Sequence, residues 1–254
     1  MTAGLAGLVC QFDLRAAVCA SPAGLADLLA DAVRELGFEY FALLHHASLA
    51  LDRANLIRLD NYPVGWTAEL TGRGLVADDP VHLACGRTHL GFRWDRLGSL
   101  VPLTARHCEI LDRSRYHGLG PGFTVPANVP GEPGGSCSFA VRQGRALPIR
   151  HLFTAELIGA RAFGAARRLH GFPSRRRRPH LSRREIQCLR LVAAGKTDWE
   201  IGRVLGISEA TARQYVKRAR SAYDVVGRTQ LVVHGLRDAW IGFDEAIPPF
   251  GGMG

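Results

Sequence analysis

The sequence lacks long apolar runs, a secretory signal and paired cysteines. No apolar stretch approaches the roughly 20 residues that a membrane span requires, and the N-terminus has no basic segment followed by an apolar one. No C-x-x-C pair occurs among the six cysteines, which are Cys10, Cys19, Cys85, Cys108, Cys137 and Cys188. Because most of them have apolar neighbours, we expect small, reduced core residues and a cytoplasmic protein without membrane contact.

Catalytic signatures are also missing. The segment AAGKT looks like the end of a phosphate-binding loop, but Arg190 occupies the position of the first glycine that such a loop requires. No G-x-S-x-G nucleophile motif occurs. A lactone or acyl hydrolase could use His45 or His46 with a nucleophile. This alternative has no recognisable set of catalytic residues in the sequence to support it. We predict no catalytic residue, no cofactor and no metal site.

What the chain does have is an uneven distribution of charge. Its 254 residues are 47% hydrophobic, which allows two globular domains. Residues 1–173 hold 17 Arg against 15 Asp and Glu, a balance of +2, and residues 174–254 carry the remaining +7 of the net +9. An excess of positive charge in the last third favours a phosphate-binding module there. A solvated basic surface is the default interpretation of charge alone.

A connector separates the two parts. Residues 170–180, HGFPSRRRRPH, combine a glycine, two prolines and four arginines, and they fit neither a helix nor a core. We predict a first domain at 1–170, a linker at 171–180 and a second domain at 181–254. The arginine run is typical of an exposed connector near phosphates, and a nuclear import signal is the alternative.

After the linker, four helices are expected. Ser182 with Glu185 and Thr197 with Glu200 have the spacing of capping boxes, and each segment ends at a glycine. The first helix has one apolar face, made of Ile186, Leu189, Val192 and Ala193. A last helix is expected from about residue 229 to 241, with Leu231, Val232 and Leu236 directed inward.

The third helix, opened by Ser208, separates two kinds of side chain. At about 100° per residue, one stripe is apolar and consists of Ala212, Val216, Ala219 and Tyr223. The opposite side is basic and polar, with Arg213, Gln214, Lys217 and Arg220. This is the layout of a helix-turn-helix, whose second helix enters the major groove, where Arg and Lys donate to guanine and Gln pairs with adenine. An ordinary surface helix of a small bundle is the alternative.

Residues 184–231 resemble the DNA-binding domain of LuxR-type transcription regulators. The matching positions are Glu185, Leu189, Gly195, Lys196, Thr197, Glu200, Ile201, Ile207 and Ser208. The segment departs from the family pattern at Gly202, Ala212 and Tyr215, where the family more often has Ala, Val and His. The resemblance implies double-stranded DNA as a partner, with Arg213 and Lys217 at base edges.

The same DNA-binding domain occurs with different sensors, among them the phosphorylated receiver domain. A receiver needs a lysine beside its acidic pocket. The chain has only two lysines, Lys196 and Lys217, and both follow the linker. The receiver interpretation is therefore excluded.

The first domain alternates between helical and extended patterns. Helices are predicted at residues 21–37, 104–114 and 151–169, and strands at residues 38–46, 55–63, 122–129 and 136–144. Helices interleaved with an antiparallel sheet indicate an α-β-α sandwich, so the whole chain is α+β with an all-α four-helix second domain.

Several residues of this domain have the chemistry of a ligand site. Tyr62 and Trp66 lie four residues apart at the start of a helix that Pro63 opens, so their polar tips can share one side. Asp79 precedes a proline, and Trp94 follows an extended stretch. The alternative is that the aromatic residues belong to the core and that the aspartate caps a helix or forms a turn.

These residues resemble, at family spacing, the signature of the autoinducer-binding domain of LuxR-type quorum-sensing receptors. The matching set is Asn61-Tyr62-Pro63, Trp66, Asp79-Pro80 and Trp94. Residues 118–135 are similar to the glycine-rich hairpin of that family. The ligand in such receptors is an N-acyl-homoserine lactone, buried between sheet and helices.

The resemblance also implies a role for each residue. Trp66 donates to the lactone carbonyl, Asp79 accepts the amide N–H, Tyr62 bonds the amide carbonyl, and Trp94 packs on the lactone ring. Cys137 falls where relatives often have a Ser or Thr that assists at the amide carbonyl, and a thiol is a weaker donor. Leu70 stands where many relatives have an aromatic residue.

The resemblance implies a homodimer, formed through the helix at 151–169, that presents two recognition helices to two DNA half-sites. RNA polymerase is a further expected partner. An orphan regulator of the same family, which answers a non-lactone signal or acts without ligand, is the main alternative.

Overall fold

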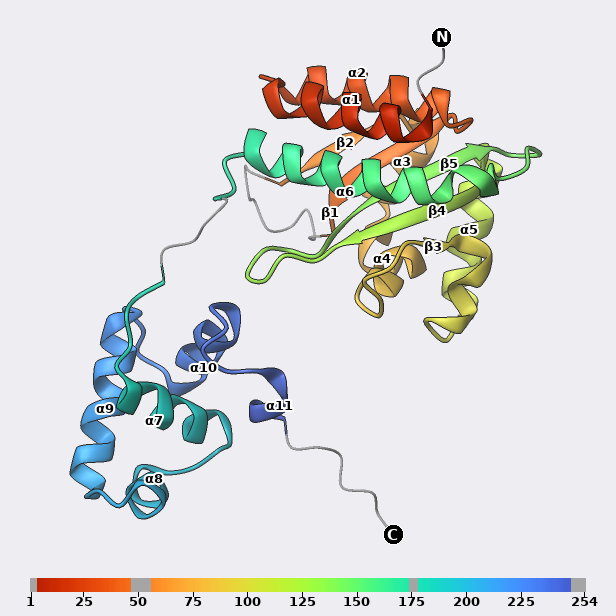
Figure 1. Cartoon of the computed structure of the whole chain (residues 1–254). Helices are drawn as coiled ribbons and strands as arrows, with labels where there is room; N and C mark the ends of the chain where they lie inside the picture. Colours follow the sequence, from red (N-terminus) through yellow and green to blue (C-terminus); the bar gives the residue numbers. More distant parts are fainter. Residues whose placement is uncertain (1–3, 47–55, 174–177, 248–254) are drawn as a thin grey trace. The chain divides into compact units, whose positions relative to one another are not determined.

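The computed structural model describes residues 4–46, 56–173 and 178–247 (Figure 1). The chain divides into two compact units, Met1–Ser174 and Arg175–Gly254. Residues 174–177, which include most of the arginine run, lie outside the described residues, as does the start of the strand expected at 55–63. No helix within the described ranges is long and apolar enough to cross a membrane.

The first unit is built on one antiparallel sheet of five strands, in the order β2-β1-β5-β4-β3. The central pair joins β1 to β5 in a register that sets Leu43 opposite Cys137 and Ala42 opposite Ser138. Along the chain the strands are β1 (Tyr40–His45), β2 (Arg58–Asp60), β3 (Phe92–Arg93), β4 (Leu119–Ala127) and β5 (Gly135–Arg142). The predicted strands are therefore confirmed, and the two-residue strand β3 is added at one edge.

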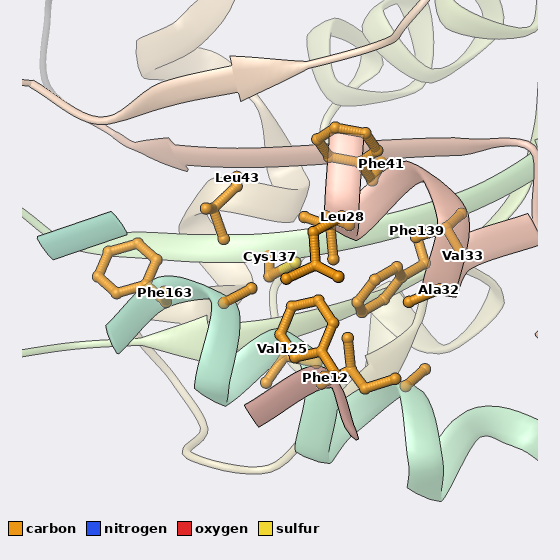
Figure 2. Close-up of a cluster of buried hydrophobic side chains, with 14 of the residues drawn as sticks. Phe12, Leu28, Ala32, Val33, Phe41, Leu43, Val125, Cys137, Phe139 and Phe163 are labelled. Carbon is orange, nitrogen blue, oxygen red and sulfur yellow. The ribbon is translucent and has the colours of Figure 1, made fainter. Parts of the chain in front are cut away.

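Three helices cover one face of this sheet: α1 (Leu5–Val18), α2 (Pro22–Glu35) and α6 (Leu152–Leu169). They enclose the main core, in which Phe12, Phe41 and Phe139 are almost fully buried (Figure 2). The cap of α2 is as predicted, because the hydroxyl of Ser21 accepts a hydrogen bond from the amide of Gly24.

Helix α1 was not expected from the sequence. Its buried residues, Leu8, Phe12 and Ala16, form a single narrow stripe at every fourth position. The helix also begins at Gly4 without a side-chain cap. The sequence of α1 therefore shows neither a broad apolar face nor a helix start signal. The helix is stabilised by its packing against α6, which no local pattern reveals.

The second face carries shorter elements: α3 (Val64–Gly72), α4 (Pro80–Cys85), α5 (Ala105–Tyr116) and the 3₁₀ turns η1 (Leu75–Asp78) and η2 (Trp94–Ser99). Together with the sheet and the first helical layer they complete the predicted α-β-α arrangement (Figure 1). This thinner layer leaves space against the sheet.

The expectation that the cysteines are core residues is half right. Cys85, Cys137 and Cys188 are buried, whereas Cys10 and Cys108 are exposed and Cys19 is partly exposed. All six are free. Cys10 and Cys108 lie on the outer sides of α1 and α5. Their apolar neighbours in the sequence point inward, but the two cysteine side chains do not.

The second unit is all helical: α7 (Arg183–Ala193), α8 (Asp198–Leu205), α9 (Glu209–Ala222), α10 (Arg228–Arg237) and the single turn α11 (Phe243–Ala246). Both predicted capping boxes are present, and Ser208 caps α9. The apolar stripe of α9 is buried as expected at Ala212, Val216 and Ala219.

The predicted last helix is too long, because α10 ends at Arg237 and Ala239 has a positive φ of 54°. Ile241 is nevertheless buried, since the chain turns back onto the Leu189 side chain. Ile241 is apolar and buried but not helical, and for this reason the helix predicted from the apolar pattern extended past the true end of α10.

We expect the Phe12→Ala substitution to lower the free energy of unfolding of the first unit by about 3–5 kcal/mol, because it opens a cavity between α1 and the sheet. The matched control is Leu14→Ala on the same helix, where the side chain is 72% exposed. It should change stability by about 0.5 kcal/mol or less. Denaturant unfolding of the full chain measures both, and equal effects would show that α1 does not contribute to the core.

Candidate functional site

A small cavity lies between the sheet and the second helical layer. Its volume is about 50 Å³, which is room for a few water molecules. Its walls come from β1, β2, β4, β5, α3, α4, α5 and η2, and they include Tyr62, Trp66, Asp79 and Trp94. The structure thus brings together four of the five side chains that the sequence singled out, although they come from three separate segments.

Cys137, the fifth, does not reach the cavity. Ser138 of β5 lines the cavity, while Cys137 faces the main core beneath α6 (Figure 2). Successive side chains of a strand point to opposite faces, so a shift of one residue moves a side chain to the other side of the sheet. Cys137 therefore lies in the main core and not at the cavity where the sequence led us to expect it, and the neighbouring Ser138 lines the cavity instead.

Trp94 is fixed by a short chain of hydrogen bonds. Its indole N–H donates to the Thr124 hydroxyl at 2.8 Å, and Thr124 shares a 2.8 Å hydrogen bond with Ser138. The ring lies flat against Gly122, where an added Cβ would come within 2.5 Å of it. Gly122 is therefore required for the close approach of the indole to β4, and the face of Trp94 remains available to the cavity.

Asp79 has two functions. Its Oδ1 accepts a 2.8 Å hydrogen bond from the amide of Val81 and so caps α4, with Pro80 at the first helical position. The alternative interpretation of Asp79 as a cap is thus correct. The same side chain is buried and lines the cavity, and its Oδ2 lies 3.9 Å from Nε2 of His82. Capping leaves the second oxygen free to accept a ligand donor.

Trp66 in the first turn of α3 and Tyr62 just before that helix add hydrogen-bond donors. Trp66 is 3% exposed, and its indole N–H has no hydrogen-bond partner among the described residues. Burial raises the pKa of Tyr62, and the nearby Asp79 carboxylate raises it further, so the phenol keeps its proton and remains a donor. The cavity therefore combines an acidic acceptor with two buried donors.

A cluster of charges holds α3 against α5. The Glu69 carboxylate accepts hydrogen bonds from Arg113, from His117 Nε2 at 2.7 Å and from Arg73 at 3.0 Å. These bonds hold the pKa of Glu69 at about 2, with Arg113 as the largest contribution. The His117 ring also packs against Trp66 at a centroid distance of 6.1 Å. The cluster orients the helix that carries Trp66.

Sequence reasoning missed several cavity-lining side chains, chiefly Arg58, Asp60, Thr67, His82 and Ser138. Strand alternation around Phe139 could have placed Ser138 on the side opposite the core. His82, three residues after Asp79, could have been placed beside it by helical spacing once α4 was expected. Arg58 and Asp60 depend on the pairing of β2 with β1, which no local pattern specifies.

His45 and His46 lie on opposite faces of the sheet. The His45 ring packs between Phe163 and Phe172, whereas His46 Nε2 lies 2.8 Å from the hydroxyl of Ser136. That distance suits a base and its nucleophile, but Ser136 is fully buried and a substrate cannot reach it. The pair is a structural hydrogen bond.

The helix α9 presents the predicted DNA-contacting side chains unequally. Arg213, Gln214 and Lys217 are exposed. Arg213 is held by Glu209 at 2.5 Å and lies 3.6 Å from Asp198. Arg220 is half-buried and donates to the backbone carbonyl of Val226, so its guanidinium supports the turn after α9.

The half-buried His46 predicts sensitivity to acid. Burial lowers its pKa well below the usual 6.5, and His82 and His45 lower it further. The unfolded chain binds a proton near pH 6.5 and the folded one does not, so stability is complete above that pH and falls as the pH drops below it. His46→Gln should flatten this acid limb, which urea unfolding at pH 5 to 8 measures. The exposed His89→Gln should leave it unchanged, and an unaltered limb in His46→Gln would refute the assignment.

Each of the two units matches the model of a known protein family. The family model described as "Autoinducer binding domain" matches residues 21–168, and the model described as "Bacterial regulatory proteins, luxR family" matches residues 179–234. The first match covers more than half of the chain and contains the whole cavity. The second contains α7, α8 and α9.

Individual relatives are distant. The transcriptional activator VanR of Vibrio anguillarum is 26% identical over 211 residues, covering 81% of this chain and 86% of VanR. LuxR of Aliivibrio fischeri is 22% identical over 218 residues, covering 84% of this chain and 86% of LuxR. Among solved structures, Escherichia coli SdiA has a TM-score of 0.62 at 22% identity, covering 92% of this chain and 97% of SdiA. A complex of SdiA with octanoyl-rac-glycerol has the same TM-score and identity, covering 93% and 96%.

The structural likeness shows the fold, and the family matches identify the regulator. Proteins of this family are transcription regulators and not enzymes, which agrees with the inaccessible Ser136. With an autoinducer-binding domain around the cavity and a LuxR-type helix-turn-helix domain after it in the chain, the protein belongs to the LuxR family of transcription regulators.

Proposed function

We propose that the chain binds an N-acyl-homoserine lactone in the cavity of its first unit and thereby controls promoter binding as a homodimer. The observation that carries this proposal is the convergence of Tyr62, Trp66, Asp79 and Trp94 on one buried space. The ligand-binding domain would comprise residues 1–170, the linker 171–180 and the DNA-binding domain 181–254.

The polar groups of the cavity match those of an acylated lactone. The Asp79 Oδ2 would accept the amide N–H, and the protonated Tyr62 would donate to the amide carbonyl. The indole of Trp66 would donate to the lactone carbonyl. A buried amide whose donor and acceptor are both satisfied avoids a penalty of about 1–3 kcal/mol for each lost partner.

The two other residues act by shape and support. Trp94 would pack its face on the lactone ring, because its N–H is already donated to Thr124. Ser138, and not Cys137, lies beside this site, and its hydroxyl is well placed to assist at the amide.

The cavity is smaller than the roughly 300–1,000 Å³ of typical ligand pockets. Binding of an acyl chain therefore requires that wall side chains move outward. Each added CH₂ contributes about 0.8 kcal/mol of favourable burial, which must exceed the free-energy cost of moving the walls further. This favours a short acyl chain. Binding to the folded state alone would also stabilise the first unit.

A non-lactone signal is the second candidate. The octanoyl-rac-glycerol that accompanies SdiA is an acylated molecule without a lactone or an amide. Such a ligand would not need Asp79 as an amide acceptor. The contribution of Asp79 to binding therefore distinguishes the two candidates.

DNA binding is assigned to α9, whose exposed Arg213, Gln214 and Lys217 would reach base edges in the major groove. Arg220 would act at the backbone, since its guanidinium is engaged with the turn that follows. Dimerisation through α6 would present two such helices to two half-sites. We further infer a cytoplasmic location and a contact with RNA polymerase.

We expect full-length protein, expressed with an equimolar panel of acyl-homoserine lactones, to retain one of them at about one-to-one stoichiometry by mass spectrometry of an organic extract. Asp79→Asn should lower retention about tenfold or more, because it removes a charged acceptor, while Asn still caps α4. The adjacent Asp78→Asn is the control, as this carboxylate is 54% exposed. Full retention by Asp79→Asn would show that Asp79 does not hold the ligand amide, whereas a wild-type protein that retains no lactone would favour a non-lactone ligand.

For DNA binding, Lys217→Ala should weaken affinity about tenfold for a duplex selected from a random-sequence library. Because Lys217 is assigned to base edges, its affinity loss should be larger for the selected duplex than for an unrelated one. Arg184→Ala on α7 removes the same charge from another exposed helix and serves as the control. Equal losses in both variants would mean that net charge, and not α9, governs binding.

A further inference from the structure

His82 occupies an unusual place in the cavity wall. Only 10% of its side chain is exposed, and its Nε2 lies 3.9 Å from Asp79 Oδ2. Both groups line the cavity. Neither the family signature nor the proposed contacts of the ligand amide use this imidazole.

The hydrogen bond on the other ring nitrogen fixes its chemistry. His82 Nδ1 lies 3.1 Å from the backbone carbonyl of Val76. A carbonyl oxygen only accepts, so Nδ1 carries the proton and the neutral ring leaves Nε2 as an acceptor. Asp79 is also an acceptor and cannot donate to it. Within the described residues, Nε2 therefore has no donor partner.

The ring is also held in place. His46 stacks on His82 with a centroid distance of 4.1 Å and an interplanar angle of 16°. The His46 ring is itself anchored by its 2.8 Å contact with Ser136. A stacked ring that is bonded at Nδ1 has little freedom to turn its unpaired nitrogen away from the cavity.

We infer that His82 selects ligands whose acyl chain carries a hydroxyl group close to the amide. This inference rests on the proposed function. Asp79 Oδ2 and His82 Nε2 are 3.9 Å apart. When the ligand amide donates its N–H to Oδ2, a second donor on the ligand at a similar distance from the amide nitrogen can donate to Nε2. A hydroxyl on the third acyl carbon is four bonds from the amide nitrogen and spans this separation. A ketone at that carbon offers only an acceptor, which faces the lone pair of Nε2.

The donor and acceptor pattern gives a ranking that requires no variant. Full-length protein is expressed with equimolar N-(3-hydroxybutanoyl)-, N-butanoyl- and N-(3-oxobutanoyl)-homoserine lactone, and with the matching six-carbon set. The proteins are purified at pH 8, where imidazole is ordinarily neutral. At each length, the 3-hydroxy ligand should be retained about tenfold over the unsubstituted one, with the 3-oxo ligand lowest.

Variants then test whether His82 is the cause. His82→Leu should abolish the preference for the hydroxyl while unsubstituted lactones are still retained. His82→Gln, which keeps an acceptor, should restore part of it. His46→Phe keeps a stacked ring and should leave the preference intact.

Each outcome has one meaning. Equal retention of hydroxy and unsubstituted lactones, or a preference that persists in His82→Leu, would overturn this inference while leaving lactone binding in place. A protein that retains none of the six lactones, and none of the longer ones in the wider panel, would refute the proposed function itself.

Discussion

The alternation of side chains across β1 and β5 is the constraint on which the rest of the first unit depends. One set of positions, including Phe41, Phe139 and Cys137, closes the main core under α1, α2 and α6. The other set presents small or polar groups, among them Ala42 and Ser138, to the cavity. One strand pair thus supplies both the apolar burial that stabilises the fold and the floor of the site. A shift of register by one residue would destroy both.

Stability and binding share residues on the second face as well. Asp79 caps α4 with one oxygen and offers the other to the cavity. Glu69 accepts hydrogen bonds from Arg73, Arg113 and His117 and thereby orients the helix that carries Trp66. These polar groups are satisfied on the protein side and leave a few unpaired atoms directed at the cavity. The polar groups of the cavity are thus held in place by the protein itself, whereas its apolar walls would have to move outward to admit an acyl chain.

The second unit follows a different logic, in which local signals determine the structure. Capping boxes at Ser182 and Thr197 start two helices, and Gly206, with a φ of 66°, ends the second of them. The small residues Ala212 and Ala219 let α9 pack closely, so its opposite side remains exposed. The polar side of α9 is therefore a direct result of the sequence. Arg220 is the exception, since its engagement with the Val226 carbonyl depends on the path of the following turn.

The sequence by itself determined the two domains' classes, most helix boundaries and four of the side chains that line the cavity, because caps, periodicity and turn residues are local properties. It missed α1, which depends on packing against α6, and it extended α10 past Arg237 because Ile241 is buried without being helical. Only the tertiary structure decided that Ser138 and not Cys137 lines the cavity, and that His82 stands beside Asp79 with an unpaired nitrogen. Those facts depend on strand register and on contacts between segments far apart in the chain, which no local pattern encodes.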